Sequence, residues 1–163
     1  MSEQEEIKNL LNSGDLEKSD DSEELIFNPY NPENREITTS EVIDILKRYG
    51  ISMANVDNVH LYKRAFIHKS YTKRPQLENI ENNIKIVEKP DNCLPLKSKS
   101  NERLEFLGDG VLELITKYSL YRRFPKENEG FMTEKKIALV KNEAIGKIAY
   151  EMGLHNFYIM SRH

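Results

Sequence analysis

Apolar residues recur every three to four positions in five stretches of the chain, the spacing that places them on one face of an α-helix. The stretches cover residues 38–50, 59–70, 102–121, 132–141 and 142–153. The first also has helix boundary signals, a capping-box spacing at its start and a glycine at its end. The pattern therefore predicts an all-α fold.

Two other parts of the chain lack this period. Residues 1–36 are rich in Ser, Asp, Glu and Asn and contain two Asn-Pro pairs, so we expect an acidic, disordered tail. Residues 72–100 contain three prolines. The segment IKIVE within them alternates like a strand, but Pro90 follows closely, and we interpret the whole as a loop insertion. The folded domain is accordingly predicted over residues 37–163.

Charge is distributed unevenly along the 163 residues, although the net charge is only −3. Residues 1–36 contain eleven acidic and three basic residues, a net charge of −8, whereas residues 37–163 have a net charge of +5. An acidic tail on a basic body is compatible with a nucleic-acid partner. A charge of +5 is also ordinary for a protein surface, so both interpretations stay open.

Cys93 is the only cysteine, which excludes an internal disulfide bond and a metal site made of several thiolates. No stretch approaches the roughly 18 apolar residues that would span a membrane. The acidic N-terminus lacks the basic start and apolar run of a secretory signal. We therefore expect no membrane association and an intracellular, cytoplasmic location.

The helix predicted at residues 102–121 has carboxylates along one side. At about 100° per residue, these acidic residues fall within about 80° of arc. They are Glu102, Glu105, Asp109 and Glu113. The apolar residues of the helix cluster on the opposite side, which we expect to face a core. They are Leu104, Leu107, Val111, Leu114, Ile115 and Tyr118.

Glu105 and Asp109 stand four residues apart, where like charges repel and destabilise a helix slightly. A divalent cation that neutralised them would explain the pair, and Mg²⁺ prefers oxygen ligands. Gly108 and Gly110 flank Asp109, and each costs roughly 1 kcal/mol relative to Ala inside a helix. Close approach by a ligand or another backbone would account for them. From spacing alone, a metal site and a solvated acidic surface are about equally good interpretations.

The segment NERLEFLGDGVLEL, residues 101–114, resembles the signature of ribonuclease III, the endonucleases that cut double-stranded RNA. AFIHKSY, residues 65–71, resembles the segment that precedes this signature in the family, and residues 121–149 resemble the segment that follows it. The resemblance extends over about residues 42–163. It implies a ribonuclease III endonuclease-type helical domain.

The resemblance also implies roles for individual residues. Glu105 and Asp109 match the carboxylates that bind Mg²⁺, or Mn²⁺ in its place, and that activate the attacking water. Glu102 matches a residue implicated near the scissile phosphate, and these three are the expected catalytic residues. Glu129 matches a further acid of the RNA cleft. Phe106 matches an aromatic side chain that inserts into the partner subunit, because the family works as a homodimer.

The implied activity is Mg²⁺-dependent hydrolysis of phosphodiester bonds in double-stranded RNA, giving 5′-phosphate and 3′-hydroxyl ends. The family completes its metal site with a second acidic pair on a later helix, and no acidic residue follows Glu151 here. We therefore expect a domain that is incomplete at its C-terminus and a 163-residue chain that is inactive or impaired alone. The alternative is a non-catalytic module of the same fold, which binds duplex RNA or supports a ribonucleoprotein.

Overall fold

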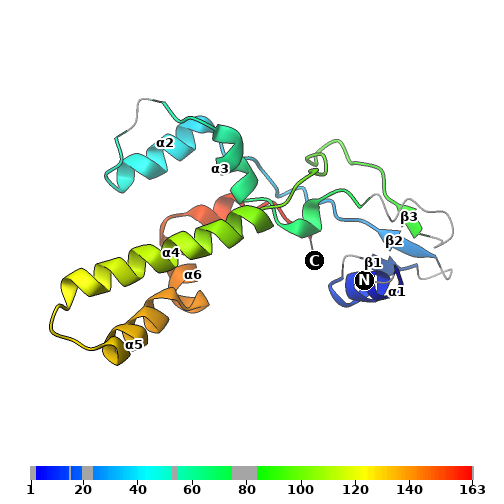
Figure 1. Ribbon diagram of the computed structural model, residues 1–163. Coiled ribbons are helices and arrows are strands. Elements are labelled where there is room, and N and C mark those ends of the chain that lie inside the picture. Colours follow the sequence, from blue (N-terminus) through cyan, green and yellow to red (C-terminus); the bar gives the residue numbers. More distant parts are fainter. Residues whose placement is uncertain (1–2, 15, 20–23, 53–54, 75–83, 163) are drawn as a thin grey trace. The chain divides into compact units, whose positions relative to one another are not determined.

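The computed structural model describes residues 3–14, 16–19, 24–52, 55–74 and 84–162. The chain divides into two compact units, each built from segments that are distant in the sequence (Figure 1). Most of the regular structure is helical, as the hydrophobic period predicts. Within the described ranges, no helix combines the length and the apolar character needed to cross a membrane.

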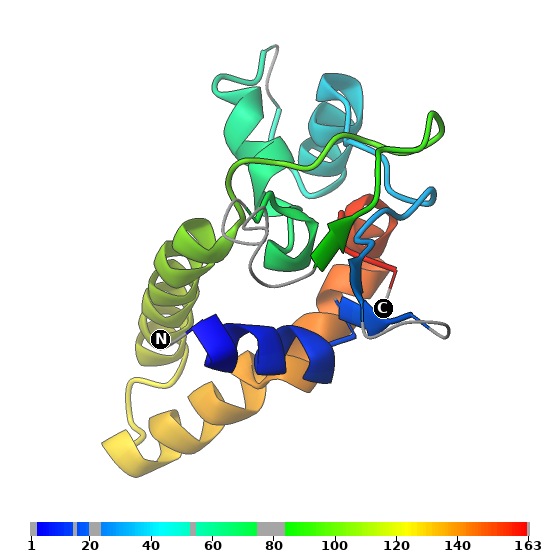
Figure 2. The same cartoon turned by 90° about the vertical axis from the view of Figure 1, so that its right-hand side faces the viewer.

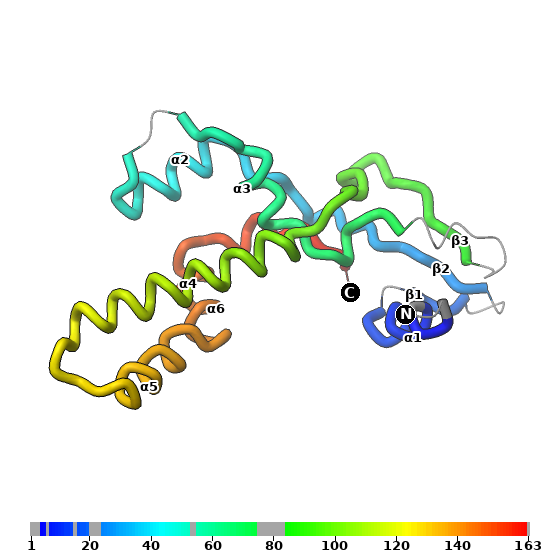
Figure 3. The backbone as a smooth tube through the Cα atoms, in the orientation of Figure 1, coloured from blue at the N-terminus to red at the C-terminus, as the bar shows by residue number. Residues whose placement is uncertain are grey.

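Unit 1 contains a small mixed sheet beside short helices. Its helices are α1 (Glu3–Asn12), α3 (Val59–Ala65) and the 3-10 helix η1 (Lys69–Tyr71). Its strands are β1 (Leu16–Lys18), β2 (Leu25–Phe27) and β3 (Ile84–Ile86). Figure 3 shows β2 between β1 and β3. The strand β2 runs antiparallel to β1 and parallel to β3, so that Leu25 pairs with Lys18 on one side and Ile84 on the other.

The structure corrects the expectation of disorder over residues 1–36, because α1, β1 and β2 all lie there. The few apolar residues of this segment are buried together: Leu10, Leu16 and Phe27 form a cluster. Ile84 and Leu96, from the predicted insertion, pack against that cluster. The apolar residues are too sparse to reveal a helical or strand period, yet they supply a buried centre once the two segments meet. Residues 75–83 of the predicted insertion lie outside the described residues.

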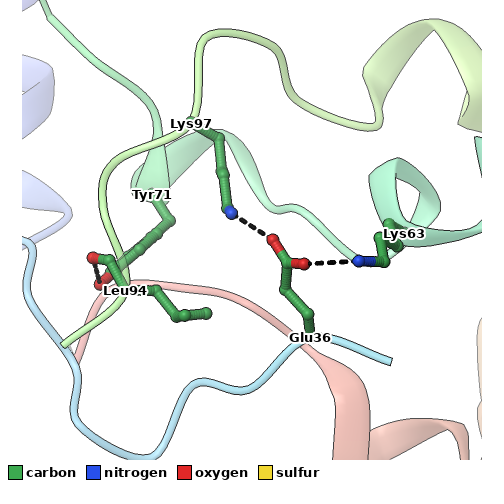
Figure 4. Close-up of polar contacts among 5 residues, drawn as sticks. All are labelled: Glu36, Lys63, Tyr71, Leu94 and Lys97. Carbon is green, nitrogen blue, oxygen red and sulfur yellow. Dashed lines mark hydrogen bonds and ion pairs between the residues drawn. The ribbon is translucent and has the colours of Figure 1, made fainter. Parts of the chain in front are cut away.

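The last part of the predicted tail is bonded to distant segments of unit 1. The side-chain amide of Asn34 donates to the Met160 carbonyl oxygen over 2.9 Å and accepts from the Met160 backbone N–H over 3.1 Å. Glu36 pairs with both Lys63 and Lys97, as Figure 4 shows. The predicted domain boundary between residues 36 and 37 therefore falls inside unit 1.

Unit 2 is helical and contains Glu102, Glu105, Asp109 and Glu113, the carboxylates on one side of α4 (Glu102–Arg123). Its other helices are α2 (Thr39–Arg48), α5 (Glu129–Val140) and α6 (Asn142–Glu151), with the 3-10 helix η4 (Leu154–Phe157) at its end. The helix α4 ends before Phe124 and Pro125, since the residue preceding a proline disfavours helical geometry. The Asn128 side chain then caps α5 by accepting from the Phe131 N–H over 3.0 Å, and α5 begins three residues earlier than predicted. The helices α4 and α5 lie side by side (Figure 2).

The apolar side of α4 differs from its prediction. Leu120 is buried, but Leu107 is 63% exposed, Leu114 68% and Tyr118 58%. The helix meets α5 along a side that includes Leu120 and Glu113, and the described residues do not cover the predicted core side. The periodicity therefore identified an apolar face correctly, but not that it would be exposed in this chain.

Candidate active site

The helix α4 presents three of the predicted site residues on an exposed surface. Glu102, Glu105 and Asp109 are all exposed, and all lie in its first two to three turns. Residues three or four positions apart are neighbours on a helix, with Cβ atoms roughly 5–6 Å apart. The regular helix thus places Glu105 within reach of both Glu102 and Asp109, which is the geometry that the sequence pattern predicted.

The residues just before α4 are held by backbone and side-chain hydrogen bonds within unit 1. The Asn101 backbone N–H donates to the Ile67 carbonyl oxygen over 2.8 Å, and its side-chain amide donates to the Ala65 carbonyl oxygen over 3.1 Å. The Nε of Arg64 donates to the Ser100 carbonyl oxygen over 2.8 Å. These contacts define the point at which α4 begins, directly before Glu102. Ala65 and Ile67 belong to the segment AFIHKSY, so this segment anchors the start of α4.

Glu113 lies on the same side of α4, but its carboxylate is neutralised by two lysines. Lys117, one turn along α4, lies 2.9 Å from it, and Lys136 of α5 lies 3.2 Å from the same oxygen. The hydrogen bond from Lys117, and after it that from Lys136, lowers the pKa of Glu113 below its ordinary value. Glu113 therefore links α4 to α5, and its two cationic partners distinguish it from Glu105 and Asp109. The pair with Lys117 was predictable from its four-residue spacing, whereas the contact with Lys136 depends on how the two helices pack.

Glu105 and Asp109 contrast with Glu113. In the part of the chain that the structure describes, neither carboxylate has a hydrogen bond or an ion pair. Two adjacent carboxylates without a cationic neighbour are the donor type that a hard divalent cation prefers. The described residues contain no group of three or more His, Cys, Asp or Glu side chains close enough to hold a metal ion. The pair thus suits Mg²⁺ in its chemistry, and supplies only part of a ligand set.

Glu129 is placed apart from this pair. It is the first residue of α5, and its Oε1 accepts from the Thr133 hydroxyl over 2.8 Å. It also lines a hollow of about 360 Å³ between α4 and α5, with Lys117 and Leu120 on the α4 side. Lys117 stands eight residues beyond Asp109, which is about 12 Å along a helix axis. The structure brings Glu105 and Asp109 together but does not add Glu129 to them, and its role in an RNA cleft stays a prediction.

Phe106 and the two glycines lie on the exposed surface of α4. Phe106 is 86% exposed, the largest such fraction among the exposed large hydrophobic side chains of the described residues. A Cβ atom added at Gly108 or Gly110 would meet nothing within 4 Å. No described part of the chain therefore explains these glycines by close contact, and an external ligand or partner stays the predicted reason.

The sequence is similar to proteins of the ribonuclease III family. The sequence model of the ribonuclease III domain matches residues 102–163. Ribonuclease 3 of Azobacteroides pseudotrichonymphae is 34% identical over 104 residues, covering 64% of this chain and 33% of the relative. Ribonuclease 3 of Enterococcus faecalis is 34% identical over 119 residues, covering 73% and 43%.

A solved structure is also similar. It is the nuclease domain of ribonuclease III from Campylobacter jejuni, studied for structural flexibility in a region involved in dimer formation. It superposes with a TM-score of 0.52 at 30% identity, covering 74% of this chain and 66% of the other. The chain spans less than half the length of the two ribonuclease 3 relatives, from 33% to 43%.

Proposed function

Because the chain belongs to the ribonuclease III family, we propose that it is part of an endoribonuclease that hydrolyses double-stranded RNA with the help of Mg²⁺. The observation that carries the proposal is the contrast among the acids of α4. Glu113 is neutralised by two lysines, whereas Glu105 and Asp109 repel each other without a cationic partner among the described residues. A helix that keeps such a pair exposed suits a site for a cation.

The three acids have different positions for this reaction. Glu105 and Asp109 would hold Mg²⁺ through carboxylate oxygens, one helical turn apart. Glu102 lies on the same side of α4, toward its start, where it would face the phosphate to be cut. When bound, Mg²⁺ supplies a Lewis acid that lowers the pKa of a water ligand and stabilises charge on the leaving oxygen. The products of such hydrolysis in this family carry 5′-phosphate and 3′-hydroxyl ends.

The proposal includes a homodimer, in which Phe106 contacts the partner subunit. Its ring is almost fully exposed, and other large apolar side chains of α4 are exposed with it. Large apolar side chains gathered on the exposed surface of one helix favour an interaction site. The similarity to the Campylobacter jejuni nuclease domain, in which dimer formation is documented, supports this assignment.

A non-catalytic duplex-RNA-binding module is the second candidate. It is favoured by the finding that the described residues contain no group of three or more His, Cys, Asp or Glu side chains close enough to hold a metal ion. For the same reason we expect the 163-residue chain alone to bind a divalent cation weakly and to cleave poorly. Both candidates share the fold, and they differ in whether Glu105 and Asp109 bind a cation.

Titration with Mn²⁺, followed by the paramagnetic broadening of backbone NMR signals, separates the two. The proposal predicts that broadening centres on residues around Glu105 and Asp109, and that Glu105→Gln and Asp109→Asn each abolish it. Glu113→Gln is the matched control on the same helix, and it should leave the broadening in place. Equal broadening in Asp109→Asn and in the unaltered chain would contradict a cation site at this pair.

A further inference from the structure

A second hollow lies in unit 1, outside residues 102–163 that match the family model. Its volume is about 350 Å³, and its lining comes from the N-terminal segment and from the chain on either side of the undescribed residues 75–83. Three basic residues line it, Lys73, Arg74 and Lys89, and no acidic side chain does so among the described residues. The hollow is therefore electropositive.

The apolar part of this hollow is fixed by buried aromatic contacts. Tyr30 lines it and meets Tyr71 edge to face, with ring centroids 6.4 Å apart. Tyr71 is fully buried, and its hydroxyl donates to the Leu94 carbonyl oxygen over 2.8 Å (Figure 4). Leu96, two residues further along, also lines the hollow. The aromatic ring of Tyr30 is thus held in place beside the basic residues.

The basic residues have donors that the described chain leaves unused. The Nη2 of Arg74 donates to the Lys69 carbonyl oxygen over 3.3 Å. The Nε of Arg74 is shielded from solvent and has no partner among the described residues. Lys89 donates to the carbonyl oxygens of Pro90 and Cys93, over 2.9 and 3.4 Å, and an ammonium group has three donors. Lys89 and the guanidinium of Arg74 therefore have further N–H donors available for an anionic acceptor in the hollow.

We propose that this hollow binds one unpaired nucleotide of an RNA strand, with its phosphate on Arg74, Lys73 and Lys89 and its base against Tyr30. The volume lies at the low end of the roughly 300–1,000 Å³ typical of small-ligand sites, which suits a single nucleotide. A base reaches an aromatic side chain only when it is unstacked, so the occupant comes from a single-stranded end or loop and not from within a duplex. The inference rests on the proposed function, because it takes RNA as the substrate. It assigns to the N-terminal segment and the insertion a contact with the unpaired parts of that RNA.

Binding of a short, fluorescently labelled single-stranded RNA to the full 163-residue chain tests the proposal, without added metal. We expect Arg74→Gln and Tyr30→Leu each to weaken binding by about tenfold, and inorganic phosphate to compete with the RNA. Lys85→Gln is the control, because Lys85 lies on β3 next to Ile86 of the hollow, and alternate side chains of a strand point to opposite faces. It should change the affinity less than about twofold, as expected for an exposed charge that does not line the hollow.

Three results would overturn the proposal. One is equal weakening by Lys85→Gln and Arg74→Gln, which would indicate general attraction to the basic surface. Another is tighter binding of a duplex without unpaired ends than of the single strand. The third is binding of an acidic peptide with no binding of RNA. Thermal unfolding of each variant confirms that it is folded, and Arg74→Lys provides a conservative second variant that should retain part of the affinity. Asp109→Asn should bind the single strand normally, so failure at this hollow is distinguishable from failure of the catalytic proposal.

Discussion

Individual charges on α4 differ in the partners that surround them. Glu113 is paired with Lys117 and Lys136, and its carboxylate is stabilised in the ionised form. Glu105 and Asp109 lack such partners among the described residues, so their mutual repulsion is not relieved by protein groups. Spacing alone groups all these acids together, and only the positions of the lysines separate a structural carboxylate from candidate ligands.

Substitution of Gly108 by Ala tests whether α4 keeps this glycine for an external contact. The added methyl group meets nothing within 4 Å, and alanine favours a helix by roughly 1 kcal/mol over glycine. Gly108→Ala should therefore raise the free energy of unfolding measured with urea, while it lowers RNA cleavage in the active protein. Gly146→Ala in α6, where the site is equally open, is the control. Gly146→Ala should stabilise the fold to a similar extent and leave cleavage unchanged. Equal rates of cleavage by the two variants would show that Gly108 is not needed for function.

Glu36 should make the stability of unit 1 depend on pH. Hydrogen bonds from Lys97 and then Lys63 lower the pKa of Glu36 below its ordinary value of 4.5, although partial burial opposes them. Because the folded-state pKa is the lower one, the stabilisation is present above about pH 4.5 and is lost as the pH falls through the folded-state value. Glu36→Gln should lower the free energy of unfolding by about 1 kcal/mol near neutral pH.

The difference between Glu36→Gln and the unaltered chain should shrink in acid, as measured by urea unfolding across the pH range. Glu33→Gln is the control, since the Glu33 side chain has no ion pair among the described residues. A difference that stayed constant down to the lowest pH would show that the two lysines do not act through the Glu36 charge.

Among the elements, α4 is the one whose surroundings matter most for function. Glu105 and Asp109 lie on its acidic side, Glu113 and Leu120 join the same helix to α5 further along, and Leu114 lies on the exposed apolar side. Exposed apolar surface of this extent favours association with another surface. The exposed apolar side chains of α4 therefore support the proposed contact of this helix with a partner subunit.

Phe106→Ala should reduce self-association of the chain. A few large side chains dominate a typical interface, and as one of them the Phe106 ring should contribute about 1 kcal/mol, so its removal gives roughly a fivefold higher dissociation constant. Sedimentation velocity over a range of concentrations measures this directly. Tyr49→Ala, which removes a half-exposed ring at the end of α2, should leave the association unchanged. Identical sedimentation of Phe106→Ala and the unaltered chain would contradict the dimer contact.

The helices were easier to predict from the sequence than the strands. The period of apolar residues in α2 and α4 spans several turns, so both helices and their ends were predictable to within a few residues. The strands β1 and β2 are three residues each, too short for an alternating pattern. The strand β3 does lie in the alternating segment IKIVE, so the loop interpretation, which relied on Pro90, is wrong there. The parallel pairing of β2 with β3 joins segments almost sixty positions apart, and nothing local marks it. The pair Glu105 and Asp109 follows from spacing, whereas the contact of Glu113 with Lys136 depends on how α4 packs on α5.

In the molecule as a whole, the helical unit carries the family signature and unit 1 carries most of the residues outside it. The N-terminal segment is part of unit 1, because Asn34 is bonded to Met160 and Glu36 to two lysines. The proposed nucleotide site lies there as well. The chain thus combines residues that match the ribonuclease III domain with an N-terminal segment and an insertion for which we propose a separate RNA contact.

Cleavage of duplex RNA in the presence of Mg²⁺ tests the central claim, that Glu105 and Asp109 form the catalytic cation site. It is measured with the longest natural protein that contains this chain, comparing Asp109→Asn with Glu113→Gln on the same helix. We predict that Asp109→Asn lowers the rate of cleavage by at least about a hundredfold while RNA binding persists, and that Glu113→Gln changes it by less than about tenfold. Cleavage by Asp109→Asn at the rate of the unaltered protein would contradict the account.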